Sequence, residues 1–165
     1  MMKYSDEWNN LVSADRNTIG SFHSSIPVRV GEIAKAFGLI VRVSTLDVGI
    51  SGMIFPDGES YKIVINKHEP VYRQRFTLAH ELAHYLLHRE LIGAGISDNV
   101  LYRSKLSDKV EAEANRLASD ILMPVERVKE AKLEFSASKL ADALSPLAGQ
   151  FGVSEDAMRI RLGMK

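Results

Sequence analysis

Two histidines and a glutamate within residues 77–88 have the types and the spacing of a metal-dependent hydrolase. His80 and His84 are four residues apart in a segment that reads as a helix, so both imidazoles can turn toward a single ion. Glu81 follows His80 directly, where its carboxylate can reach a water that the metal activates rather than the metal itself. The metal lowers the pKa of that water and the carboxylate takes the proton. The pattern therefore predicts a metal-dependent peptidase.

The residues around this motif predict the helix that must carry it. Pro70 suits a first helical turn, and neither Gly nor Pro interrupts residues 71–91. Apolar residues recur at helical spacing and give the segment a broad apolar side: Phe76, Ala79, Leu82, Ala83, Leu86 and Leu87. The alternative is an ordinary core or surface helix that carries two histidines without a metal, because so short a motif also occurs by chance.

A zinc site that keeps one position open for water needs a third protein ligand. The sequence has no Cys, so that ligand must be His, Asp or Glu. A second predicted helix, residues 110–124, offers Glu111, and Asn115 shares its face and can orient a ligand by a hydrogen bond. Glu113 points about 200° around the helix axis from Glu111, so we interpret it as a solvated charge. We predict that Glu111 is the third ligand.

His88 is the other possible third ligand, because it continues the series of histidines four residues apart. On an unbroken helix it would lie about 12 Å along the axis from His80. Three such histidines could meet on one ion only if the helix bent, and residues 85–87 contain no glycine that would turn the chain. We therefore interpret His88 as a satisfied histidine at the end of the helix or as a neighbour of the site.

The two motif blocks together resemble the ImmA/IrrE family of metallopeptidases. The first block is the run Arg73–His84, and the second combines Glu111-x-x-x-Asn115 with the sequence Ile-Leu-Met-Pro at residues 121–124. The second block carries as much weight as the first, because it is not part of a general zinc-peptidase pattern. The resemblance covers roughly residues 28–162.

This resemblance implies that His80, His84 and Glu111 bind the metal and that Glu81 is the catalytic base. It implies as substrates helix-turn-helix repressors of the XRE type, whose cleavage switches on mobile-element, phage or stress-response genes. Two His and one Glu favour Zn2+, with Mn2+ possible because metal supply also decides occupancy. The alternative function is a non-proteolytic module that binds a repressor or acts as an antitoxin-like partner.

Length and composition are those of one ordinary globular domain. The chain has 165 residues, 45% hydrophobic and 25% charged, which is enough to bury a core. Basic and acidic residues both number 21, so the formal net charge is zero and gives no indication of a polyanionic partner. The N-terminal residues lack the apolar stretch of a signal peptide, and no segment reaches transmembrane length. We expect a soluble cytoplasmic protein with no membrane partner.

The order of predicted elements indicates an α+β, zincin-like domain over residues 26–165, preceded by an N-terminal extension, residues 1–25, that is loosely held or partly helical. We expect a small three-stranded sheet, a metal-binding helix, a ligand helix and a helical C-terminal tail. Pro-Asp-Gly at residues 56–58 predicts a hairpin turn. The predicted elements ahead of the metal-binding helix are a helix over 28–37 and strands over 39–43, 51–55 and 61–65.

Two segments could contact a substrate. Residues 49–54 are our candidate for an edge strand that pairs with an extended peptide. Residues 91–107 form a predicted loop between the ligand helices, from which Tyr102 or Arg103 could stabilise an oxyanion. The alternative for both side chains is ordinary exposure in a solvated loop.

The tail, residues 136–162, resembles a helix-turn-helix. We expect a helix over 136–144, a break at Ser145-Pro146, a short helix over 147–151, and a final helix over 155–162 that begins at the cap Ser154. The charge of the final helix is nearly balanced, whereas a DNA reader needs phosphate-neutralising charge. We therefore interpret the tail as structural or as a docking surface for a repressor, and direct nucleic-acid binding is not expected.

Overall fold

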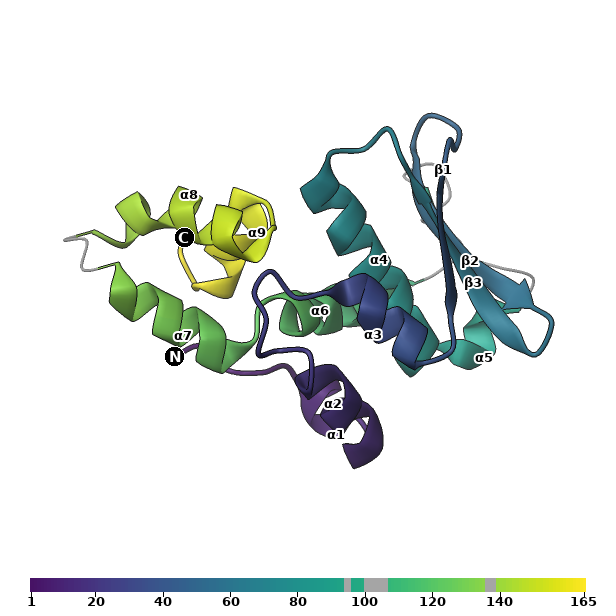
Figure 1. Ribbon diagram of the computed structural model, residues 1–165, viewed down its shortest axis with the longest axis horizontal. Helices are drawn as coiled ribbons and strands as arrows, with labels where there is room; N and C mark the ends of the chain where they lie inside the picture. The colour runs from purple at the N-terminus through teal and green to yellow at the C-terminus, as the bar shows by residue number, and fades with distance from the viewer. Residues whose placement is uncertain (94–95, 100–106, 136–138) are drawn as a thin grey trace.

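The computed structural model describes residues 1–93, 96–99, 107–135 and 139–165, and these residues form a mixed α and β architecture. The sheet lies at one end of the molecule, helices lie against one of its faces, and the C-terminal helices form the opposite end (Figure 1). The predicted α+β class is confirmed. Among the described helices, none combines the length and the apolar character that crossing a bilayer requires.

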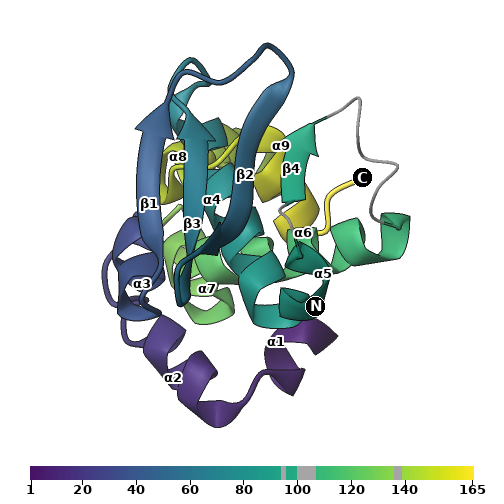
Figure 2. The same ribbon diagram turned by 90° about the vertical axis from the view of Figure 1, so that its right-hand side faces the viewer.

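The described part of the sheet contains four strands rather than the three that the sequence predicts. In spatial order they are β1 (Ile40–Ser44), β3 (Ser60–Asn66), β2 (Ile50–Asp57) and β4 (Ile96–Asn99), as Figure 2 shows. β1 runs parallel to β3, and the other two pairs are antiparallel. The three predicted strands are all present. The fourth, β4, lies in the segment predicted as a loop, because its Ile-Ser-Asp-Asn sequence carries no apolar alternation that would mark a strand.

The prediction that residues 49–54 form an edge strand is wrong. β2 is paired on both sides, since Gly52 lies opposite Ile65 of β3 and opposite Asp98 of β4. The outer strands of the described sheet are therefore β1 and β4. Main-chain pairing with a distant segment places β4 beside β2, and such pairing leaves no trace in the local sequence of β2.

Two packed helices lie behind the sheet, α4 (Val71–Leu87) and α6 (Asp108–Leu122). The α4 residues from Thr77 to His84 are all buried. α4 approaches β2 at Gly52, where an added Cβ would lie 2.6 Å from Thr77 Cγ2 and 3.0 Å from the carbonyl oxygen of Val64. A glycine at this position therefore lets the strand pack closely against the helix.

The helix that carries His80 and His84 ends earlier than predicted. α4 stops at Leu87, His88 takes φ −130° and ψ 34°, and a short helix, α5 (Arg89–Ile92), follows. The sequence of residues 71–91 contains no Gly or Pro, so no local signal marks this end. The break coincides with side-chain contacts of His88 that are described below.

The N-terminal residues pack against the rest of the chain through α1 (Asp6–Asn10) and α2 (Ser13–Gly20). Of the two alternatives that the sequence left open for this extension, the helical one is observed. Trp8, Leu11 and Ile19 are buried in the core. The next helix, α3 (Val30–Ala36), agrees with the helix predicted over 28–37.

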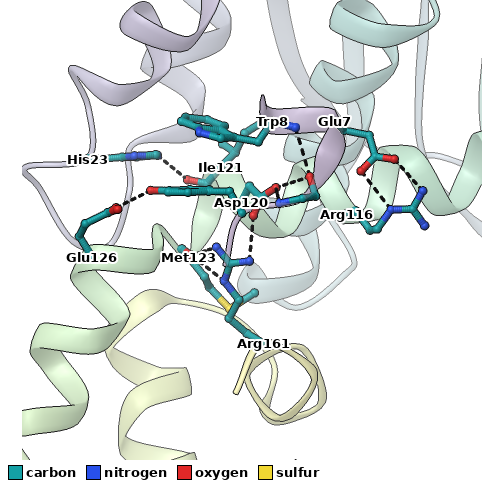
Figure 3. A network of polar contacts seen from close by, with 11 residues as sticks. Glu7, Trp8, His23, Arg116, Asp120, Ile121, Met123, Glu126 and Arg161 are labelled. Atoms are coloured by element: carbon teal, nitrogen blue, oxygen red, sulfur yellow. Dashed lines mark hydrogen bonds and ion pairs between the residues drawn. The ribbon is translucent and has the colours of Figure 1, made fainter. Parts of the chain in front are cut away.

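A buried carboxylate joins the two ends of the chain to α6 (Figure 3). Asp120 is 0% exposed and accepts hydrogen bonds from the backbone N–H and the hydroxyl of Ser5. It also accepts one from Arg161 Nη1 at 2.8 Å, and the same guanidinium donates to the carbonyl oxygen of Met123 at 2.9 and 2.6 Å. These hydrogen bonds replace the water that the Asp120 carboxylate and the Arg161 guanidinium lose on burial.

The C-terminal part contains α7 (Val125–Glu134), α8 (Leu140–Phe151) and α9 (Glu155–Arg161). The sequence pattern predicted no helix over the residues of α7, and it predicted a break at Ser145-Pro146, which lies inside α8. In the structure α8 continues through Pro146. Proline costs a helix one backbone hydrogen bond, and burial of the apolar residues on both sides offsets that loss: Ala143, Leu144, Leu147, Ala148 and Phe151. Residues 136–138 of the first predicted tail helix lie outside the described residues.

The turn between α8 and α9 is anchored to α4. Gly152 ends α8 in the left-handed conformation, with φ +64°, and Ser154 caps α9 as predicted. Arg75 of α4 donates to the carbonyl oxygens of Gly152, at 3.2 Å, and Val28, at 2.8 Å. A Cβ on Gly152 would lie 2.8 Å from Arg75 Nε, so both the backbone angle and the contact favour glycine here.

We expect Arg161→Ala to lower the free energy of unfolding by about 3–5 kcal/mol, because it leaves the Asp120 carboxylate buried without its cation. Arg159→Ala is the matched control: this arginine pairs with Asp156 at the surface, and such pairs contribute about 1 kcal/mol or less. Urea denaturation of both variants measures the difference. Equal losses in the two variants would contradict the structural role of Arg161.

Candidate metal centre

The predicted site residues meet at the contact between α4 and α6. His80, Glu81 and His84 lie on α4, and Glu111 and Asn115 lie on α6. The three α4 residues are almost inaccessible, with exposed fractions of 4%, 0% and 0%. The helix periodicity that places His80 and His84 on one face also places Glu111 and Asn115 on the facing side of α6.

The ring nitrogens of the two histidines and the carboxylate of Glu111 converge on one point. Glu111 Oε2 lies 3.2 Å from His80 Nε2, and Glu111 Oε1 lies 3.1 Å from His84 Nε2. The two Nε2 atoms are 3.0 Å apart. One ligand atom from each of the three residues can be chosen so that all lie within 4.8 Å of one another.

The other ring nitrogen of His80 faces Asn115. Its Nδ1 lies 2.8 Å from Asn115 Oδ1. An amide oxygen only accepts, so the proton of a neutral His80 belongs on Nδ1 and the lone pair on Nε2. That lone pair then points toward His84 and Glu111, which is the orientation that a metal ligand needs.

The electrostatics of the cluster favour metal-binding protonation states. Burial lowers the pKa of His84, so the ring is neutral near pH 7 and keeps a lone pair for a cation. Burial raises the pKa of Glu111, but its contacts with His80 and His84 lower it by more, and the net pKa lies far below the ordinary value. Glu111 is therefore an anion at any physiological pH.

Two imidazole nitrogens and one carboxylate are a donor set that fits a divalent ion with an open coordination position. Zinc in catalytic sites has three protein ligands of these types and leaves the fourth position for water or substrate. His80, His84 and Glu111 are the residues that could hold such an ion, and all three contribute atoms to the same convergence point. Glu81, the residue after His80 on α4, is fully buried.

His88 lies beside the cluster, as one of the two interpretations of the sequence expects. Its Nδ1 is 3.0 Å from His84 Nδ1, on the side of the His84 ring away from His80 and Glu111. His88 Nε2 lies 3.2 Å from Glu113 Oε2. The interpretation of Glu113 as a solvated charge is wrong, because its carboxylate is paired and its side chain is only 23% exposed.

The sequence carries a signal for this pair in the spacing of its two residues from the predicted ligands. His88 follows His84 by four residues, and Glu113 follows Glu111 by two. An angle around the axis of α6 alone does not reveal the pair, because the break of α4 at His88 moves that ring to where Glu113 can reach it. Tyr102 and Arg103, the predicted oxyanion donors, lie outside the described residues.

Comparison with known families assigns most of the chain to one of them. Residues 34–163 match the model of a peptidase family described as the IrrE N-terminal-like domain. The chain belongs to the ImmA/IrrE family of metallopeptidases. This agrees with the resemblance seen in its two motif blocks.

Two individual proteins also match the chain. Metallopeptidase ImmA of Bacillus subtilis (strain 168) is 33% identical over 82 residues, which are 49% of this chain and 46% of that protein. A solved structure named Mycobacterium tuberculosis transcriptional regulator superposes with a TM-score of 0.59 at 18% identity, over 96% of this chain and 49% of that chain. The second likeness concerns the fold alone. The chain spans about half the length of each of these two proteins.

We expect purified protein to take up one zinc ion per chain, and His84→Ala and Glu111→Ala to lose it, because each removes one of three ligands. Asp108→Asn, an exposed change in the first turn of α6, is the matched control and should keep the metal. Elemental analysis of the four proteins after zinc loading and desalting measures the content. Metal retained in both alanine variants would contradict this ligand set.

Proposed function

We propose that the chain is a zinc-dependent endopeptidase with a zincin-like fold, in which His80, His84 and Glu111 hold the ion and Glu81 is the general base. The observation that carries the proposal is the convergence of two imidazoles and one ionised carboxylate, with the fully buried Glu81 next to His80 on the same helix. Membership of a metallopeptidase family supports it. Two nitrogens and one carboxylate favour Zn2+, and Mn2+ is the second candidate.

Each side chain of the site then has one task. A divalent ion held there supplies Lewis acidity, which lowers the pKa of a water and polarises a peptide carbonyl. Glu81 accepts the proton that the attacking water loses and returns it to the nitrogen of the leaving amine. Asn115 holds His80 in the tautomer that binds a cation. Burial excludes bulk water, which strengthens the electrostatic interactions among these groups.

As substrate we propose a helix-turn-helix repressor of the XRE type, cleaved in the cytoplasm to relieve repression. Family membership supports a protein substrate. The fold is shared with a protein named as a transcriptional regulator, which is consistent with a role in transcription.

The final helix, α9, has little free positive charge for nucleic acid. In α9, Arg161 is turned inward to Asp120, and Arg159 pairs with Asp156. A protein that neutralises phosphates needs such cations at its surface. We therefore propose that the tail is structural or docks the repressor.

We expect Glu81→Gln to keep the fold and the metal but to cut repressor cleavage by roughly 10²–10⁴-fold, the usual contribution of a general base. Glu32→Gln, an exposed substitution on α3, is the matched control. The assay incubates each zinc-loaded protein with purified XRE-type repressors and follows fragments by mass spectrometry.

Two outcomes of this assay would contradict the proposal. Cleavage by Glu81→Gln at the wild-type rate would exclude Glu81 as the base. If no repressor is cut, and wild type and Glu81→Gln relieve repression equally in a reporter assay, the chain acts as a non-proteolytic repressor-binding module.

A further inference from the structure

A chain of polar contacts leads from the metal centre to a second carboxylate. His84 Nδ1 lies 3.0 Å from His88 Nδ1, and His88 Nε2 lies 3.2 Å from Glu113 Oε2. The exposed fractions of the three side chains are 0%, 7% and 23%, so the chain starts in the core and ends near the surface. These contacts are separate from the contacts among His80, His84 and Glu111 themselves.

The position of His88 excludes it from the ligand set. His84 presents Nε2 to His80 and Glu111, and it presents Nδ1 to His88. A cation bound at Nε2 is therefore on one edge of the ring, and His88 is on the other. His88 can act on the metal centre only through His84.

The hydrogen-bonding rules assign the protons along this chain in one direction. The Glu113 carboxylate only accepts, so His88 Nε2 must donate to it. The Nδ1 of a neutral His88 then carries a lone pair, and His84 Nδ1 must be the donor in the contact between the two rings. His84 Nε2 is left with a lone pair that faces Glu111 and His80.

The reverse tautomer of His84 would break the chain. With its proton on Nε2, His84 would need a proton from His88 Nδ1, and a neutral His88 would turn a bare Nε2 toward the carboxylate of Glu113. Two acceptors would then lie 3.2 Å apart in a partly buried site, which is unfavourable. Glu113 thus selects the tautomer of His84 that can bind a cation.

We propose that His88 and Glu113 are positioning residues that fix the ring orientation and the tautomer of the metal ligand His84. The inference rests on the proposed metal site. Asn115 orients His80 through one direct hydrogen bond. For His84 the same orientation comes through two contacts, one to His88 and one from His88 to Glu113. Outer hydrogen-bond partners of this kind affect metal affinity by about 10–100-fold.

The test compares variants that remove the chain with one that restores part of it. His88→Leu removes the nitrogen that accepts the hydrogen bond from His84 Nδ1. Glu113→Ala removes the carboxylate that favours the proton on His88 Nε2, and through it the tautomer of His84. His88→Gln keeps a carbonyl oxygen that can accept from His84 Nδ1. His68→Leu and Glu90→Gln are the matched controls, because both side chains are exposed and neither touches the cluster contacts described above.

The first measurement is zinc affinity of the full chain, by titration against a competing chelator. We expect affinities about 10–100-fold weaker for His88→Leu and Glu113→Ala, partial recovery in His88→Gln, and no change in the controls. Thermal unfolding of the metal-free proteins separates this effect from a loss of fold.

The second measurement reads the hydrogen bond itself. In zinc-loaded wild type with 15N-labelled histidine, NMR should show a downfield Nδ1–H proton of His84 in slow exchange with water. His88→Leu should move that proton upfield and speed its exchange, and the controls should leave it in place.

The possible failures are distinguishable. Wild-type zinc affinity and an unchanged Nδ1–H signal in His88→Leu and Glu113→Ala would overturn the positioning role and leave the proposed function intact. A loss of thermal stability in these variants, without a change in zinc affinity or in the Nδ1–H signal, would also overturn the positioning role. Absence of zinc binding by wild type would overturn the proposed function and the positioning role with it.

Discussion

The contact between α4 and α6 is the constraint on which the rest of the structure depends. It must bring His80 and Glu111, 31 residues apart in sequence, within 3.2 Å of each other. Polar groups at such a contact lose water and do not by themselves drive it closed. The attraction comes from apolar residues around them on both helices: Leu78, Ala79, Leu82, Ala83, Ala114, Leu117 and Ala118. The apolar faces hold α4 and α6 together, and the polar pairs determine which residues of the two helices lie opposite each other.

Segments outside the motifs hold these two helices in place. Gly52 lets β2 approach α4, and Arg75 fastens α4 to the turn that follows α8. On the other helix, Ser5 and Arg161 meet at Asp120. The helix-turn-helix-like tail is therefore joined to α4 and to α6 by one arginine contact each. An arginine that is buried in such a pair is also unavailable to a phosphate backbone.

The sequence predicted best what depends on neighbours along the chain. The Pro-Asp-Gly signal gave a two-residue turn between Asp57 and Ser60, and apolar periodicity located α3, α4 and α6. The spacing of His80 and His84 predicted that their side chains share a face, because a helix turns a spacing of four residues into one face. Glu111 was predicted from its residue type, from the face it shares with Asn115 and from the second motif block.

What the sequence did not predict depends on partners far away in the chain. β4 pairs through its main chain, so its residues carry no pattern. α8 continues through Pro146 because the packing of its apolar side outweighs a local breaker. Glu113 was interpreted as solvated because the angle around one helix axis does not reveal where the end of a second helix lies. Each of these failures has the same cause, namely that tertiary contacts override local preference.

α6 carries more of the site than its single predicted ligand suggests. Besides Glu111 it supplies Asn115 to His80 and, through His88, Glu113 to His84. The two residues that anchor it, Arg116 through Glu7 and Asp120 through Ser5, follow these in sequence on the same helix. A small rotation of α6 would therefore displace one ligand and both orienting contacts together, while α4 and its two histidines stayed in place. The N-terminal helix α1, which lies outside the matched family region, contacts α6 and restrains this rotation. The residues that contact the two histidines of the candidate site and the residues that anchor the chain ends to the domain thus belong to one helix.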